Sequence, residues 1–181
     1  MLGPRTFPLL RVGEHAAFIS FAWSIAARYR ADRRIPVGTA ATQGELWGAK
    51  ARDWAEIQEP PWIPVFEQVL DLAGVGAGTR LLDIGCGAGG ALVLADARGA
   101  EPSGIDASEA LIAVARERLP QARLEVGEME ELPFPDDSFD AVTGINAFQF
   151  AGDITVALAE AGRVCRPGGN VLMVVWGRPE D

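Results

Sequence analysis

Residues 81–90 read LLDIGCGAGG, so that an aspartate, Asp83, ends an apolar run and a glycine-rich stretch follows at once. The stretch GCGAGG (85–90) satisfies two glycine patterns, G-x-G-x-x-G and G-x-G-x-G, of which the first is the dinucleotide fingerprint. Glycines at such positions permit a turn with positive φ and let a ligand touch the main chain. A tight turn that packs a helix against a strand, with no ligand, is the alternative interpretation.

Two carboxylates near this stretch favour a ligand without phosphate. Asp83 stands two residues before the first glycine. It would repel a pyrophosphate there, by roughly 3 kcal/mol at ~6 Å and an effective dielectric of ~20, whereas it would attract an ammonium group. Asp106, in GIDAS, lies 21 residues after Gly85. This is the spacing of the carboxylate that binds ribose hydroxyls in nucleoside-binding folds. The alternative is a plain helix-entry residue beside the N-cap Ser108.

A third candidate segment is GEMEELPFPDDSFD, which follows an expected strand. The carboxylate of Glu128 could accept a hydrogen bond from the exocyclic amine of adenine, and Met129 could lie on the ring face. A solvated acidic loop is the alternative.

The elements that must position these residues alternate between short apolar runs and helical segments. Strands are expected at 79–85, 102–106, 122–127, 139–145 and 170–177, with helices between them. This alternation predicts an α/β, Rossmann-like parallel sheet of about five strands with helices on both faces. Ligands of such sheets bind at the carboxyl ends of the strands, where Asp83, Asp106 and Asn146 fall.

The composition narrows the partners. The chain has 181 residues and a formal net charge of −9, which argues against a nucleic-acid partner bound through phosphates. The acidic excess lies in residues 61–181, which favours a neutral or cationic ligand. Two cysteines without a framework spacing and a single histidine predict a cytoplasmic protein without a metal site.

Residues 1–41 are interpreted as an N-terminal extension to a domain over residues 42–181. The apolar run 16–27 is too short to cross a bilayer, and no membrane association is expected. A helix packed on the domain is the favoured interpretation of this run. A signal peptide and a poorly ordered upstream segment are the alternatives.

Four motifs in register, LLDIGCGAGG, GIDAS, GEMEELPFPDDSFDAV and RVCRPGG, resemble the class I S-adenosylmethionine-dependent methyltransferases. The resemblance covers about residues 42–178 and is strongest to the small-molecule group related to quinone-biosynthesis methyltransferases. It implies S-adenosylmethionine as cofactor, a small-molecule methyl acceptor, and methyl transfer to oxygen, nitrogen or carbon. Since this cofactor is cationic and has no phosphate, it also accounts for the charges around the glycines.

The resemblance further implies roles for individual residues. The main chain at the glycines approaches the methionine part, with Asp83 and the carbonyl of Asn146 near its ammonium group. Asp106 binds the ribose, and Glu128 and Met129 address the adenine. No catalytic acid or base is implied. Trp54, with Trp47 two helical turns before it, would cover the cofactor as a lid. The alternative is that the two tryptophans form the core-facing side of a helix. The expected cofactor-binding residues are Asp83, Gly85, Cys86, Gly87, Gly89, Asp106, Ala107, Glu128, Met129, Asn146, Phe148 and Trp54.

The chain departs from the family after the fifth expected strand, where the usual last two strands are missing. We therefore expect a truncated domain whose fifth strand exposes an edge, covered by a partner or by a second copy. Two other functions remain open at this point. One is a non-catalytic cofactor-binding remnant or regulatory subunit; the other, which the carboxylates disfavour, is an NAD-dependent oxidoreductase.

Overall fold

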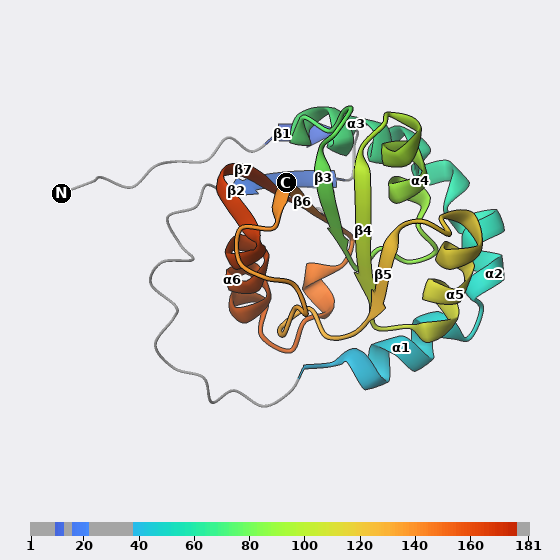
Figure 1. Ribbon diagram of the computed structural model, residues 1–181. Helices are drawn as coiled ribbons and strands as arrows, with labels where there is room; N and C mark the ends of the chain where they lie inside the picture. The colour runs from blue at the N-terminus through green and yellow to red at the C-terminus, as the bar shows by residue number, and fades with distance from the viewer. Residues whose placement is uncertain (1–9, 13–15, 22–37, 177–181) are drawn as a thin grey trace.

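Seven strands form the central sheet of the computed structural model, which describes residues 10–12, 16–21 and 38–176 (Figure 1). Their order across the sheet is β1-β2-β7-β6-β3-β4-β5. The strands are β1 (Leu10–Val12), β2 (Ala16–Phe21), β3 (Arg80–Ile84), β4 (Glu101–Asp106), β5 (Arg123–Val126), β6 (Phe139–Ile145) and β7 (Cys165–Trp176). Strands β3 to β7 are parallel, which confirms the predicted five-stranded α/β sheet. The strand order reverses between β3 and β6, so a crevice is expected at their carboxyl ends.

Helices cover both faces of the parallel strands. The helices are α1 (Ala40–Gly48), α2 (Ala51–Asp53), α3 (Ile63–Ala73), α4 (Gly90–Ala97), α5 (Glu109–Arg118) and α6 (Ile154–Val164), with short turns η2 (Trp54–Gln58), η3 (Pro60–Trp62) and η4 (Phe148–Phe150). Alternate side chains of each strand enter opposite cores: Leu81 packs with α3, α4 and α5, whereas Leu82 packs with α6. The central strands β3 and β6 are thus buried on both faces, which is why their sequences are largely apolar.

Helix ends follow the local signals in the sequence. The Ser108 hydroxyl accepts a hydrogen bond from the Leu111 N–H at 3.2 Å, and Asp153 caps α6 in the same way. Gly74 ends α3 in the left-handed conformation, with φ 71°. The cap at Ser108 confirms the N-cap expected from the sequence, and Asp153 and Gly74 mark the start of α6 and the end of α3.

The apolar run near the N-terminus corrects the predicted helix. Ala16–Phe21 is a strand, β2, which pairs antiparallel with β1 and, over all six residues, with Val171–Trp176 of β7. A run as uniformly apolar as residues 16–27, with only two serines, cannot be assigned to helix or strand by period alone. Here the unpaired edge of β7 decides, because it offers a row of hydrogen-bonding groups that a helix could not satisfy. Residues 22–27 of the run lie outside the described residues.

The prediction that the fifth parallel strand, β7, exposes its edge is therefore wrong as well. β2 occupies that edge and β1 lies beyond it, so the sheet contains two antiparallel strands drawn from the N-terminal segment (Figure 1). A partner is not needed to cover β7.

Within the described part of the chain, no helix has the length and apolarity that crossing a bilayer requires.

Candidate functional site

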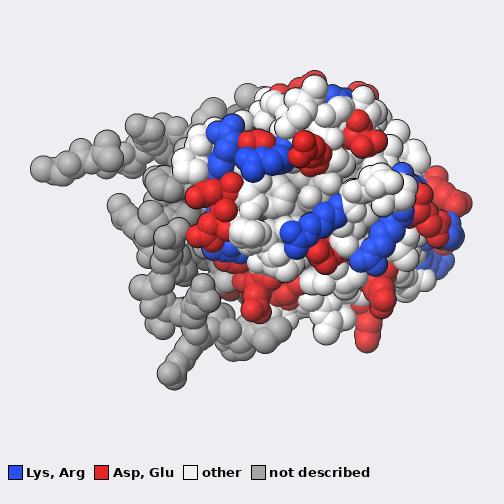
Figure 2. Space-filling view, viewed as in Figure 1, with Lys and Arg blue, Asp and Glu red and all other residues white. Residues whose placement is uncertain are grey.

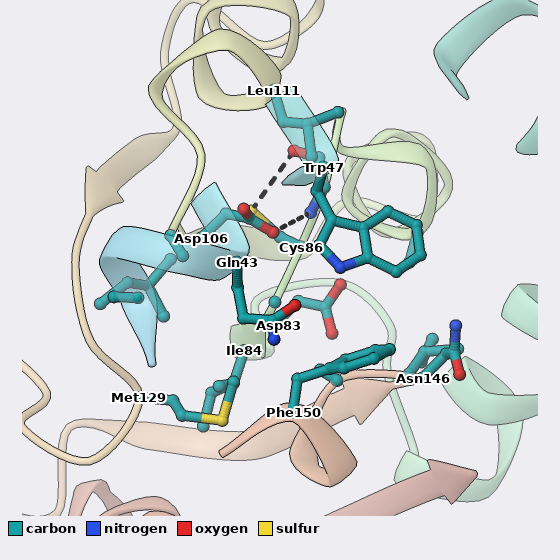
Figure 3. Close-up of a pocket in the computed structure, with 18 of the residues that line it drawn as sticks. Gln43, Trp47, Asp83, Ile84, Cys86, Asp106, Leu111, Met129, Asn146 and Phe150 are labelled. Carbon is teal, nitrogen blue, oxygen red and sulfur yellow. Dashed lines mark hydrogen bonds between the residues drawn. The ribbon is translucent and has the colours of Figure 1, made fainter. Parts of the chain in front are cut away.

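A pocket lies where the strand order reverses, at the carboxyl ends of β3, β4 and β6 (Figure 3). Its floor is the glycine turn after β3, and its other walls come from α1, η2, α3 and the loops after β5 and β6. Most of the residues selected from the sequence line it: Trp54, Asp83, Gly85, Cys86, Gly87, Asp106, Ala107, Glu128, Met129 and Asn146, together with Trp47.

The glycine turn is held by the carboxylate of Asp106. Gly85 and Gly87 have φ of 71° and 56°, a region that favours glycine. One Asp106 oxygen accepts from the Gly87 N–H at 2.9 Å (Figure 3), and the other accepts from the Ser108 N–H at 2.8 Å. Burial raises the pKa of Asp106, and these two backbone hydrogen bonds partly offset that effect. One side chain thereby connects the first two loops of the site.

Asp83 is a buried carboxylate facing the same pocket. It is 3% exposed, and one of its oxygens accepts from the Thr143 hydroxyl at 2.7 Å. Burial raises its pKa to about 7; the Thr143 hydrogen bond opposes this, and the charges of Asp106 and Glu59 add to it. A charged carboxylate at this position is costly until a cation lies beside it.

This burial predicts a pH-dependent stability. Because Asp83 binds its proton more tightly when folded, its ionisation destabilises the fold as the pH rises through about 4 to 7. Between pH 5 and pH 8 the free energy of unfolding should fall by about 2–3 kcal/mol from this group. In Asp83→Asn that component should vanish, which urea unfolding of both proteins at the two pH values would reveal. Equal pH dependence in the two proteins would contradict the assignment.

Asn146 follows β6 in a conformation that few non-glycine residues adopt. Its φ is 55°, and its N–H donates to the Val174 carbonyl at 2.8 Å. The Gln149 amide donates to its side-chain oxygen. Asparagine tolerates this left-handed region better than most residues, and such strain concentrates at binding sites.

Helix α1 covers the pocket and is tied to it at both the β5 and the β6 loop. The Ala40 N–H donates to a Glu128 oxygen at 2.9 Å, and the Thr39 hydroxyl donates to the Phe150 carbonyl. Gly44 lies against Ala107, where a Cβ would sit 2.3 Å from the Ala107 carbonyl oxygen. This close approach requires glycine, and it brings Gln43 into the pocket wall.

Aromatic rings form the wall opposite the strands. Trp47 meets Trp54 edge-on at 5.1 Å between ring centroids and Phe150 at 5.5 Å. Both tryptophans also pack against the small apolar cluster that includes Ala51 and Ala55. The core-face interpretation of these tryptophans is therefore confirmed. Both rings also line the pocket, and the lid over a cofactor stays a prediction.

Two selected residues do not line the pocket. Gly89 is the N-cap of α4, packed near Ala115, and Phe148 is fully buried against Gly144 in the core beside α6. The ring that reaches the pocket from this turn is Phe150 instead. Other polar or aromatic residues line the pocket and were not predicted from the sequence: Thr39, Gln43, Glu59, Trp62, Phe66 and Phe150. The sequence gives little sign of them, since they come from elements whose docking depends on tertiary contacts.

The charge of the pocket is one-sided. Four carboxylate residues line it, namely Glu59, Asp83, Asp106 and Glu128, and none of the described lining residues is Lys, Arg or His. Among the described residues no group of His, Cys, Asp and Glu is arranged to hold a metal ion. The pocket therefore suits a ligand that carries positive charge and hydroxyl donors and lacks phosphate.

Known proteins with similar sequences share this region. An uncharacterized protein of Mycobacterium tuberculosis is 33% identical over 141 residues, covering 76% of this chain and 51% of the relative. The demethylmenaquinone methyltransferase of Staphylococcus aureus is 38% identical over 119 residues, covering 62% of this chain and 49% of the enzyme. The chain thus spans about half the length of these curated relatives.

Solved structures and family models agree with the sequence relatives. The geranyl diphosphate C-methyltransferase of Streptomyces coelicolor, solved with S-adenosyl-L-homocysteine, matches with a TM-score of 0.56 and 26% identity, over 61% of this chain and 42% of that one. Residues 82–173 match a family model described as a methyltransferase domain, which spans the glycine turn and three of the four pocket carboxylates, Asp83, Asp106 and Glu128. The chain belongs to the class I S-adenosylmethionine-dependent methyltransferases.

Proposed function

We propose that this chain binds S-adenosylmethionine in the pocket and transfers its methyl group to a small-molecule acceptor. The observation that carries the proposal is the set of four carboxylates around a glycine main chain, with no cationic side chain among the described lining residues. A dinucleotide would place two phosphates against this set, whereas a sulfonium and an ammonium group are attracted to it.

The adenosine end is assigned to the loops after β4 and β5. Each Asp106 oxygen accepts one backbone N–H and has lone-pair capacity left for a ribose hydroxyl. Glu128 holds the start of α1 through the Ala40 N–H, and the same carboxylate can accept from the adenine amine. Met129 and Ala107 would supply apolar contact to the ring.

The methionine end is assigned to the glycine turn and β6. The main chain at Gly85 and Gly87 is bare enough for direct contact, and Asp83 and Asn146 lie at neighbouring strand ends. The Trp54 indole nitrogen lies 3.3 Å from where a Cβ on Gly87 would sit. We assign the Trp54 indole N–H as the hydrogen-bond donor to the methionine carboxylate, which is the one negative group of the cofactor.

The chain's own residues contribute alignment rather than acid–base chemistry. S-adenosylmethionine, when bound, supplies a methyl group activated by the adjacent sulfonium. Gln149 donates to Asn146, and Asp153 caps α6, so neither is offered as a general base. The rings of Trp47, Trp54 and Phe150 exclude water from the space above the glycine turn. Fixed orientation of two reactants can lower the barrier of such a displacement by about 7–11 kcal/mol.

The acceptor is inferred to be neutral or cationic and largely apolar. The wall left for it combines aromatic rings with carboxylates and offers no described cation to bind a phosphate. The Streptomyces neighbour acts on geranyl diphosphate, and an acceptor of that charge is disfavoured here.

On the face shown in Figure 2, acidic and basic side chains are interspersed, and its described residues present no continuous basic stripe for nucleic acid. The two free, buried cysteines support a cytoplasmic location as part of this proposal.

Calorimetry tests the proposal directly. Titration with S-adenosylmethionine and with S-adenosylhomocysteine should each give one site per chain with a dissociation constant in the micromolar range. NADH should give no heat beyond dilution. Tight NADH binding without S-adenosylhomocysteine binding would overturn the proposal in favour of an oxidoreductase. Binding without turnover on a broad panel of acceptors would support the cofactor-binding remnant instead.

A further inference from the structure

Glu59 is a buried carboxylate in the pocket wall that no sequence motif marks. Glu59 is 5% exposed. It is the C-cap of the π-helical turn η2, and its backbone N–H donates to the Trp54 carbonyl at 2.9 Å. The wider turn places the Trp54 ring and the Glu59 carboxylate together over the glycine turn. A Cβ on Gly87 would lie 3.3 Å from the Trp54 indole nitrogen and 3.8 Å from a Glu59 oxygen.

Arg118 fixes the Glu59 carboxylate from behind the pocket. Its guanidinium donates to one Glu59 oxygen at 2.6 Å, and it also donates to the carbonyls of Ala88 and Ala55, each at 3.0 Å. Arg118 itself does not line the pocket. The second Glu59 oxygen has only a long contact, 3.4 Å, from the Gly90 N–H. One oxygen is thus held by the arginine, and the other is left on the pocket side.

Glu59 stands among like charges. Its negative charge adds to the raised pKa of Asp83. The pKa of the Cys86 thiol is also raised, chiefly by burial and further by the charges of Asp106, Asp83 and Glu59. Arg118 neutralises one of the three carboxylates. A cation that enters the pocket would relieve the repulsion between these carboxylates.

We propose that Glu59 is a cofactor-binding residue that, together with Asp83, receives the α-ammonium group of the methionine part. This inference rests on the proposed function, since it assigns one further residue to the same pocket. Arg118 is a positioning residue, because it orients Glu59 and contacts no ligand. Glu59 and Asp83 approach the ammonium from η2 and from β3, so that the group lies between two carboxylates from opposite walls.

Two ligands that differ only in the amino-acid part test this assignment. S-adenosylhomocysteine carries the ammonium group, and 5′-methylthioadenosine has the same adenosine and sulfur without it. Glu59→Gln should weaken the binding of S-adenosylhomocysteine by about tenfold and leave that of methylthioadenosine within about twofold, as expected for one charge-assisted hydrogen bond. Glu125→Gln is the matched control, because Glu125 is also ion-paired to an arginine but lies on β5. It should change neither affinity.

Arg118→Gln tests the positioning role. It leaves the Glu59 carboxylate without the partner that orients it, so the preference for S-adenosylhomocysteine over methylthioadenosine should fall by about threefold. Equal loss for both ligands in Glu59→Gln, or an unchanged preference in Arg118→Gln, would overturn the inference. If Glu59→Gln lacks a cooperative thermal transition, Arg118→Gln alone decides. A wild-type chain that binds neither ligand would instead refute the proposed function.

Discussion

Replacing Asp106 with alanine is expected to weaken the binding of S-adenosylhomocysteine by at least about a hundredfold. The substitution removes the acceptor for both ribose hydroxyls, and each charge-assisted hydrogen bond contributes about 1.5–3 kcal/mol. It also frees the Gly87 and Ser108 N–H groups, so the glycine turn loses its side-chain bond to β4 and keeps only the backbone bonds to the Ile105 carbonyl. Isothermal titration of both proteins measures the change.

Ligand and variant controls distinguish this effect from general damage. Methylthioadenosine shares the ribose, so Asp106→Ala should weaken its binding as much as that of S-adenosylhomocysteine, unlike Glu59→Gln. Asp96→Ala removes an exposed carboxylate from α4 and should leave both affinities unchanged. Retained binding in Asp106→Ala, within about threefold of wild type, would refute the assignment of the ribose to this side chain.

The parallel sheet and the first two loops of the site could be predicted because their signals are local. Asp83 and Asp106 follow short apolar runs, and parallel strands bring the ends of such runs to one edge whatever else the chain does. Ser108 and Asp153 cap helices through contacts within a few residues. Each of these inferences depends only on neighbours along the chain.

The remaining features depend on contacts between distant segments. β2 is a strand because the edge of β7, about 150 residues later in the chain, is available to it. Glu59 is buried because Arg118, 59 residues away, neutralises it and because a π turn rotates it toward the glycine turn. Phe150 rather than Phe148 reaches the pocket because Gly144 admits the Phe148 ring into the core. Hydrophobic periodicity carries no information on such pairings.

The glycine turn is the other point at which one substitution should have a large effect. Gly85 combines a φ of 71° with a position where an added Cβ would lie 2.4 Å from the Ala147 Cβ. A left-handed residue with a side chain costs about 1–2 kcal/mol. Two short, rigid groups in overlap add about 1–3 kcal/mol, because neither can rotate away. Gly85→Ala should therefore lower the free energy of unfolding by about 2–5 kcal/mol.

Two other glycines divide this loss into its causes. Gly78 has a φ of 74° and nothing within 4 Å of an added Cβ, so Gly78→Ala should show the backbone strain alone. Gly76 also has open space around it and no positive φ, so Gly76→Ala should be nearly neutral. Urea unfolding should rank the losses as Gly85, then Gly78, then Gly76. Only Gly85→Ala should also abolish S-adenosylhomocysteine binding, because the overlap is relieved by separating β3 from the β6 loop, the two walls that hold the methionine end. If Gly85→Ala were no worse than Gly78→Ala and bound the ligand normally, the close contact between these two loops would not be a requirement of the site.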